Sequence, residues 1–370
     1  MTRYLEIGGN IASSFAGRML VGAGAEVIRL EIASDAWRLA QPTKPVGGHF
    51  FLRAMDTWLN SGKKSIAFRN YDAAAKHLPT ILDKIDVVLD DASLEQRRAL
   101  HLEETHEVRL PWISMTPIGR KLLELGGSSL TVSAYSAAAW AIGKPGAEPL
   151  ALPHFLPMLH AGLTGATLAL CAAITMEPVQ IDIAAAEVLA CYIDVNATQF
   201  TWERDGHRAA KSGGMYPYTI LPCRDGFVCI VGRSKADWRR ILTALGSPSW
   251  GKEPWAADVA QIAAIHADEA DRRLSALLAR YTKDDLLKLA ADFGCAMAPV
   301  RSIADLAQNA ELHHAGVLRE ALVDEVLITL PVPKRYDAAP PRVGQDGLAF
   351  LEEFGLRDHA IASDIWRDYE

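Results

Sequence analysis

The first thirty residues alternate between strand and helix patterns, and this alternation restricts the fold more than any other feature of the chain. Residues 4–8 (YLEIG) predict a short strand, and residues 26–31 (EVIRLE) alternate apolar and polar side chains as a second strand does. Between them, residues 12–23 (ASSFAGRMLVGA) predict a helix whose small residues allow close packing on a sheet. A strand, a helix and a strand in succession favour a parallel sheet, so we expect an α/β fold.

The same reading continues along the chain and suggests two domains. Further buried strands are expected at 85–89, 112–115 and 179–183, with helices over 72–83 and from Pro157 onward. Two stretches rich in Gly, Pro and polar residues resemble linkers. The predicted division is a large domain beginning with 1–200, a linker at 201–218, a small domain at 219–328, a linker at 329–345, and a closing part of the large domain at 346–370.

Composition excludes several classes of protein. The 370 residues carry a formal net charge of −7 without a run of Lys or Arg, which argues against a nucleic-acid partner. Five cysteines without a C-x-x-C motif argue against disulfides and a zinc site, and favour a reducing, cytoplasmic location. We expect no signal peptide in the opening MTRYLEIGGN, and we interpret the apolar stretch 156–176 as a buried helix and not a membrane span.

Five segments resemble, in order, motifs of the class III CoA-transferases, the CaiB/BaiF group. The segments are Ala12–Glu31 (ASSFAGRMLVGAGAEVIRLE), Leu59–Ile66 (LNSGKKSI), Asp86–Leu89 (DVVL), Tyr216–Gly226 (YPYTILPCRDG) and Pro299–Leu306 (PVRSIADL). The resemblance implies a Rossmann-like large domain, a smaller α/β domain, and two protomers interlocked like links of a chain. It also implies an acyl-CoA thioester as substrate, at the interface of the domains.

The residues on which the family's chemistry depends are different here. Transferases that this chain resembles use an Asp, in a D-x-x-A-G context, as a covalent nucleophile toward a thioester. The matching stretch is Met158–Gly162 (MLHAG), so Met158 occupies the position of the Asp, and a thioether cannot form that intermediate. The family's racemases use a G-H-D motif, which corresponds here to Gly127-Ser128-Ser129, and neither Ser suits proton exchange.

The turn that corresponds to the family's CoA-binding motif is acidic in this chain. The family's E-N-F-R-P-G is matched by Asp90–Glu95 (DDASLE), in which Ser93 replaces the Arg, and the acidic residues would repel a phosphate. The resemblance and the positions of basic groups give these candidate CoA-binding residues: Arg18, Arg29, Lys63, Lys64, Phe68, Arg69, Arg97 and Arg98. Arg97 and Arg98 could compensate for the acidic turn, whereas Lys63 and Lys64 could equally be solvated at a turn.

Three other side chains are candidates for catalysis. His154 precedes the long apolar helix and could reach a cleft, whereas His160 lies two residues after Met158, about 200° around the helix, and could be a structural histidine. Tyr216 lies in a loop that follows Gly213 and Gly214, where the family has a glycine-rich lid. No metal-binding motif is present, and the pair His313-His314 is interpreted as surface.

Three functions remain open at this point. The first is an enzyme that acts on an acyl-CoA or related thioester by an atypical mechanism, whether as lyase, hydrolase, cyclase or transferase. The second is a non-catalytic subunit paired with a homologue that has the Asp, as opposed to a homodimer. The third is a ligand-binding protein or a CoA-independent enzyme on the same scaffold.

Overall fold

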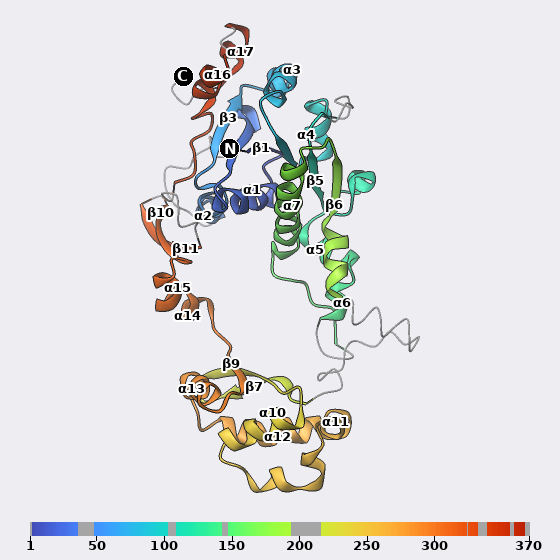
Figure 1. Ribbon diagram of the computed structural model, residues 1–370, viewed down its shortest axis with the longest axis vertical. Coiled ribbons are helices and arrows are strands. Elements are labelled where there is room, and N and C mark those ends of the chain that lie inside the picture. Colours follow the sequence, from blue (N-terminus) through green and yellow to red (C-terminus); the bar gives the residue numbers. More distant parts are fainter. Residues whose placement is uncertain are drawn as a thin grey trace. The chain divides into compact units, whose positions relative to one another are not determined.

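The computed structural model describes residues 2–35, 48–102, 109–142, 147–193, 216–323, 325–331, 339–355 and 359–366, without the side chains of 48–50, 359 and 360. Most of the predicted linker 201–218, including Gly213 and Gly214, and part of the linker 329–345 lie outside the described residues. The chain forms two compact units, drawn in Figure 1. Unit 1 comprises Met1–Ala139, Ala151–Asp194 and Asn309–Glu370, and unit 2 comprises Trp140–Leu150 and Val195–Gln308.

Unit 1 contains a parallel sheet of six strands, as the α/β pattern predicts. The strands are β1 (Arg3–Ile7), β2 (Glu26–Ile32), β3 (Lys64–Phe68), β4 (Val87–Asp90), β5 (Trp112–Thr116) and β6 (Gln180–Ala184). Their order is β3-β2-β1-β4-β5-β6, and every neighbouring pair is parallel. This is the Rossmann order, in which successive strands are added outward in one direction from β1 and then in the other direction from β4.

Helices cover both faces of this sheet (Figure 1). The helices of unit 1 are α1 (Ile11–Gly22), α2 (Gly48–Asn60), α3 (Tyr71–Leu82), α4 (Leu94–Ala99), α5 (Ser129–Tyr135), α6 (Ala138–Ala141), α7 (Leu156–Thr175), α8 (Ala185–Ala190), α15 (Ala310–His314), α16 (Gly347–Glu353) and α17 (His359–Asp364). One core packs α3, α16 and α17 on the sheet, and the other packs α1, α7 and α8 on the opposite face. Burial on both faces explains why the strands are mostly apolar, and the buried polar side chains Glu6 and Arg29 of β1 and β2 pair with each other.

Close packing of α7 on α1 depends on small residues. A Cβ on Gly162 would lie 2.5 Å from the carbonyl oxygen of Ala12, and one on Gly165 would lie 2.3 Å from Sδ of Met115. The predicted helix is present as Leu156–Thr175, and its small residues face α1 and β5. The expectation that it is buried was wrong, because only 33% of its apolar window is buried. Within the described residues, α7 is the one helix long and apolar enough to cross a membrane by length and composition; Leu163, Leu170 and Ile174 form an exposed stripe on it.

Two further elements of unit 1 come from the C-terminal part of the chain. β10 (Arg319–Val323) and β11 (Val326–Leu330) form an antiparallel hairpin. The side chain of Asp346 accepts a hydrogen bond of 2.9 Å from the backbone N–H of Ser65, and Phe350 and Leu351 enter the core beside α3. The end of the chain is thus part of the first unit.

Unit 2 is a small α/β unit with its own core. Its antiparallel sheet has the order β7 (Tyr218–Cys223), β8 (Gly226–Val231) and β9 (Ala296–Pro299). Its helices are α10 (Lys235–Ala244), α11 (Val259–Gln261), α12 (Ala267–Leu278), α13 (Lys283–Phe293) and α14 (Ile303–Ala307). Leu274 and Leu278, on one face of α12, are fully buried, and Thr282 forms a capping box with Asp285 at the start of α13.

Candidate functional site

The carboxyl ends of β1 and β4 lie side by side at the point where the strand order reverses, which is where ligands bind in open parallel sheets. Gly8 follows β1 with a φ of 97°, and a Cβ on it would lie 2.5 Å from the backbone nitrogen of Ala92. A glycine is therefore required for the loop after β1 to approach the loop after β4. Two pockets open at this edge of the sheet.

The larger pocket, which we call the apolar pocket, has a volume of about 540 Å³. It opens beside the ends of β1, β4 and β5 and the start of α7. Its apolar lining side chains are Ile11, Ala92, Leu94, Met115, Pro117, Ile118, Leu123, Leu130, Phe155 and Met158. Its polar lining side chains are Asn10, Asp91, Ser93, Thr116, Ser128, Ser129 and His154. None of these lining residues is a Lys or an Arg.

Met158 lies in the first turn of α7 and contributes to the wall of the apolar pocket. Ser128 and Ser129, which the sequence resemblance aligns with the racemase His and Asp, line the same pocket, and Ser128 caps α5 through a capping box with Thr131. The positions that matched the chemical motifs of the family are thus brought together at one cavity. The only ionisable side chains among its lining residues are Asp91 and His154.

Asp91 caps α1 from the end of β4. Its two carboxylate oxygens accept hydrogen bonds from the backbone N–H groups of Asn10, at 3.0 Å, and Ser13, at 2.8 Å. Burial raises the pKa of the Asp91 carboxyl to about 7, against the lowering effect of these hydrogen bonds. The N-terminus of α1, where a phosphate binds in many Rossmann folds, is therefore filled by a carboxylate of the protein itself.

The acidic turn after β4 is neutralised inside the protein. Asp90 pairs with the buried guanidinium of Arg97 and accepts a hydrogen bond of 2.9 Å from Nε1 of Trp112. Ser93 caps α4 and forms a capping box with Gln96. Arg97 therefore compensates for Asp90 within the fold, whereas Arg98 is exposed, with Glu124 at 3.7 Å.

The smaller pocket, which we call the Arg29 pocket, has a volume of about 100 Å³ and lies at the ends of β1 and β2. Gly8, Gly9, Arg29, Glu31, Asp35, Tyr71 and Gln96 are among its lining residues. The Arg29 guanidinium is buried near Glu6, at 3.2 Å, Asp56, at 3.5 Å, and Glu31, at 3.7 Å. These carboxylates raise the pKa of Arg29 despite its burial, and its Nη1 has no hydrogen-bond partner among the described residues.

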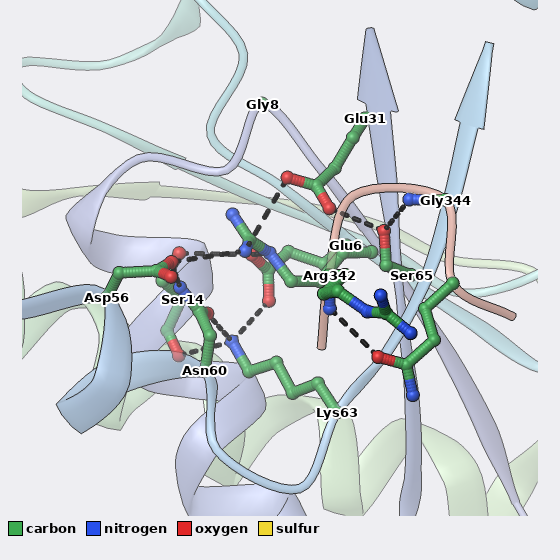
Figure 2. A network of polar contacts seen from close by, with 12 residues as sticks. Glu6, Gly8, Ser14, Glu31, Asp56, Asn60, Lys63, Ser65, Arg342 and Gly344 are labelled. Carbon is green, nitrogen blue, oxygen red and sulfur yellow. Dashed lines mark hydrogen bonds and ion pairs between the residues drawn. The ribbon is translucent and has the colours of Figure 1, made fainter. Parts of the chain in front are cut away.

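Lys63 and Glu6 form a fully buried ion pair next to Arg29, shown in Figure 2. Nζ of Lys63 lies 2.6 Å from Oε2 of Glu6 and 2.8 Å from both the carbonyl oxygen of Ser14 and Oδ1 of Asn60. Burial lowers the pKa of Lys63 to about 8, and Glu6 opposes this shift. Burial would raise the pKa of Glu6, but Lys63 and Arg29 hold it below the usual value. Lys63 thus joins β1, α1 and α2.

The remaining basic candidates do not line either of these two pockets. Arg18 is buried and donates to the carbonyl oxygens of Trp58 and Pro331, and burial lowers its pKa to about 10. Lys64 begins β3, so it lies at the amino ends of the strands, away from the two pockets, and it pairs with Glu26. Arg69 donates a hydrogen bond of 3.0 Å to the carbonyl oxygen of Ser363.

Phe68, the one apolar candidate for CoA binding, is fully buried in the core. Its ring stacks on that of His77, with ring centroids 5.8 Å apart. His77 in turn lies 2.8 Å from Oδ2 of Asp364 in α17. The contacts of Phe68 therefore connect β3 with the end of the chain.

The three candidates for catalysis occupy different surroundings. His154 is exposed in the turn before α7 and lines the apolar pocket. His160 does not line it; the His160 ring lies edge-on to Tyr192 at 5.0 Å, and its buried Nδ1 has no partner among the described residues. Tyr216 is buried in the core of unit 2 and donates a hydrogen bond of 2.9 Å to Asp271; burial, followed by the charge of Asp271, raises its pKa. Among the described residues no cluster of His, Cys, Asp or Glu could hold a metal ion.

Sequence reasoning missed the part that Asp91 takes in this site. We expected Asp91 to repel phosphate as part of an acidic turn, and did not foresee that it caps α1. Asp182 accepts a hydrogen bond of 2.8 Å from the backbone N–H of Arg120 and so holds the loop after β5. An Asp directly after a central strand in a Rossmann order is the signal that could have identified Asp91.

Comparison with known proteins agrees with this arrangement. Residues 2–347 match the model of CoA-transferase family III, and the chain therefore belongs to this family. A succinate–glutarate CoA-transferase of Agrobacterium fabrum is 23% identical over 379 residues, which cover 95% of this chain and 94% of the relative.

Solved structures of similar proteins confirm the fold. A CaiB/BaiF family protein from Brucella suis is 20% identical, with a TM-score of 0.77 over 95% of this chain and 98% of the other. The protein Rv3272 from Mycobacterium tuberculosis is 20% identical, with a TM-score of 0.74 and the same coverage of both chains. The Rossmann-like α/β fold expected from the sequence motifs is thus shown.

Proposed function

We propose that this chain binds an acyl-CoA thioester with its acyl group in the apolar pocket, and that it transfers the acyl group directly to an acceptor without a covalent acyl-enzyme. The observation that carries the proposal is the position of Met158. It lines the wall of the pocket, and the sequence resemblance aligns it with the aspartate of the family's motif. A thioether is not acylated by a thioester, so the acceptor itself must attack the thioester carbonyl.

The register that aligns Met158 with the aspartate has structural support. The motif D-x-x-A-G ends in a small pair, which corresponds here to Ala161 and Gly162. Ala161 is fully buried, and Gly162 has no room for a Cβ against Ala12. Shifting the register by one residue would move a larger side chain into this contact. The close packing of α7 on α1 therefore favours Met158 as the counterpart of the aspartate.

The reaction can proceed with the groups that the pocket offers. A nucleophilic acceptor forms a bond to the thioester carbon, the C–S bond breaks, and CoA leaves as a thiol after it gains a proton. His154 is the side chain at the pocket that could take the proton from the acceptor and return it to the sulfur, because histidine is the common acid and base of enzymes near neutral pH. The exposed position of His154 gives the acceptor access from solvent.

The nucleotide part of CoA fits less well than the acyl group does. The Arg29 pocket lies beside the apolar pocket, across Gly8 and Asp91, and Arg29 is among its lining residues, with its Nη1 3.5 Å from Asp56 and 3.7 Å from Glu31. Glu31 and Asp35 line the same pocket and oppose a phosphate. We therefore propose that an acyl-CoA is bound mainly through its pantetheine and acyl parts, and less through its nucleotide.

Binding and steady-state kinetics test the proposal. Isothermal titration with acyl-CoA should show saturable binding, and hydroxylamine should serve as an artificial acceptor that yields a hydroxamate and free CoA. Double-reciprocal plots against both substrates should intersect, because both must be bound together. Parallel lines would reveal a covalent intermediate, and the absence of any binding of CoA or its thioesters would refute the proposal.

We also propose a partner chain, either a second copy or a homologue that has the aspartate. The exposed apolar stripe of α7, formed by Leu163, Leu170 and Ile174, supports an interface. Sedimentation of the pure protein would separate the two cases, because a homodimer forms alone. If the protein is a monomer, and a thioester is consumed only after a homologue that has the aspartate is added, this chain is better explained as a non-catalytic subunit than as the enzyme proposed above.

A further inference from the structure

The apolar pocket contains one buried acid, Asp91, and one histidine, His154, which is exposed in the turn before α7. Among its lining residues, as far as the chain is described, there is no Lys or Arg, and Asp91 is 8% exposed. A carboxylate moved from water into such a pocket loses its hydration and finds no Lys or Arg to pair with, which is strongly unfavourable. The pocket thus differs from one suited to a dicarboxylic acid.

The helix N-termini at this pocket offer little compensation. The N-terminus of α1 is filled by the carboxylate of Asp91, and that of α5 by the hydroxyl of Ser128. In the first turn of α7, the N–H of Leu156 already donates to the carbonyl oxygen of Pro153 at 3.0 Å, and Pro157 has no N–H. The usual donors for an anion are therefore largely occupied.

The dimensions and chemistry of the pocket suit an apolar chain. A volume of about 540 Å³ accommodates a medium-length acyl group, and Ile118, Leu123 and Met158 provide apolar walls. Each methylene that leaves water for such a wall contributes favourably to binding.

We infer that the apolar pocket selects uncharged acyl groups, and that Asp91 excludes acyl groups that end in a carboxylate. This inference rests on the proposed function only in assuming that the acyl group is attached to CoA. The preference for an uncharged ligand does not depend on it. The succinate–glutarate CoA-transferase of Agrobacterium is named for two dicarboxylates, so this chain would differ from that relative in the class of acyl group that it takes.

Hexanoyl-CoA and adipoyl-CoA form a matched pair, because they have the same chain length and differ in a terminal carboxylate. Titration at pH 8 should show hexanoyl-CoA binding at least about 10-fold more tightly than adipoyl-CoA. Equal or tighter binding of adipoyl-CoA would overturn the inference. In Asp91→Asn, which keeps the side-chain shape, this ratio should fall by about 3-fold or more. An unchanged ratio in a folded variant would remove Asp91 from the explanation.

A second measurement does not depend on CoA. The chain has eight methionines, and Met115 and Met158 line the pocket, so methyl-labelled methionine gives a small NMR spectrum with two reporters. Met158→Leu identifies the Met158 signal. S-hexanoyl-N-acetylcysteamine should shift this signal, and S-adipoyl-N-acetylcysteamine should leave it in place.

The two measurements separate the two proposals. Shifts from the hexanoyl compound together with no binding of any CoA thioester would refute the proposed function and support the uncharged-ligand inference. A shift from the adipoyl compound alone, or from neither compound, would overturn the inference even if CoA thioesters bind.

Discussion

Oδ2 of Asp91 accepts a hydrogen bond of 2.8 Å from the backbone N–H of Ser13, so a carboxylate from the end of β4 caps the helix that follows β1. The contact joins the two strands that flank the switch point. It also places an acid in the wall of the apolar pocket. Capping, pocket chemistry and the pH dependence of stability therefore depend on one side chain.

Asp91→Asn should change the pH dependence of stability. Burial raises the pKa of Asp91 to about 7 in the folded chain, so the folded state holds a proton that the unfolded state releases near pH 4. Between about pH 4 and pH 7 this group makes the protein less stable as the pH rises, and above pH 7 its effect is constant. The amide variant lacks this effect, and because its Nδ2 cannot accept a hydrogen bond, it loses one of the two bonds to the start of α1, which costs about 0.5–1.5 kcal/mol.

Urea unfolding at pH 5 and pH 8 tests this expectation. The stability of the wild type relative to Asp91→Asn should be greater at pH 5 than at pH 8. The reverse order would contradict the assignment of a raised pKa to Asp91.

The neighbouring lysines Lys63 and Lys64 should differ in their importance for stability. Lys63→Ala leaves Glu6 buried without its ammonium partner, and breaking a buried pair in this way costs about 3–5 kcal/mol. Lys64 pairs with Glu26 while 44% of its side chain is exposed, so Lys64→Ala should cost about 0–1 kcal/mol. Denaturant unfolding compares the free energies of unfolding of the two variants directly. Similar losses of stability in both would show that the buried Lys63–Glu6 pair does not stabilise unit 1 more than the exposed pair does.

Gly162→Ala should weaken the packing of α7 on α1. The added Cβ would lie 2.5 Å from the carbonyl oxygen of Ala12, and overpacking of this kind costs about 1–3 kcal/mol. Gly22→Ala is a matched control at the end of α1, because nothing lies within 4 Å of the added Cβ. Thermal unfolding should show a lower midpoint for Gly162→Ala and an unchanged or higher one for Gly22→Ala. A stable Gly162→Ala variant would also weaken the register that aligns Met158.

His154→Ala should slow acyl transfer to hydroxylamine without loss of structure. His154 is exposed at the pocket, and the loss of a general acid or base usually costs about 100-fold or more in rate. His160→Gln is the control, because His160 does not line the pocket. The rates of both variants should be compared with that of the wild type at one pH and one concentration of each substrate. Equal effects of both substitutions would assign His154 no direct part in the reaction.

The parallel sheet could be predicted because β1, α1 and β2 have patterns that local sequence determines. β3 was not predicted as a strand, since KSIAF is short and begins with a Lys that is paired at the edge of the sheet. The β10–β11 hairpin was also missed, because its two short strands pair only with each other and β11 does not alternate in burial. Both depend on contacts that local patterns do not contain.

The candidate site could be predicted where the position of a residue along a helix decides whether its side chain reaches the pocket. The helix angle distinguished His154 from His160, and α7 begins at Leu156, which leaves His154 in the turn before it. The basic candidates were harder to judge. Arg29 and Lys63 are buried and both pair with Glu6, which is 23 residues from Arg29 and 57 residues from Lys63 in sequence. Pairing at such separations follows from the folded sheet and not from local charge.

Intact-protein mass spectrometry after rapid mixing with hexanoyl-CoA and hydroxylamine tests the central claim most directly. Met158→Asp is the comparison, because an Asp in the first turn of α7 is favoured by the helix dipole and restores a possible nucleophile. The account predicts that the wild type consumes the thioester and shows no protein mass increase at any time, whereas acylated protein accumulates only in Met158→Asp. Acylated wild-type protein that forms and decays at the rate of turnover would contradict it.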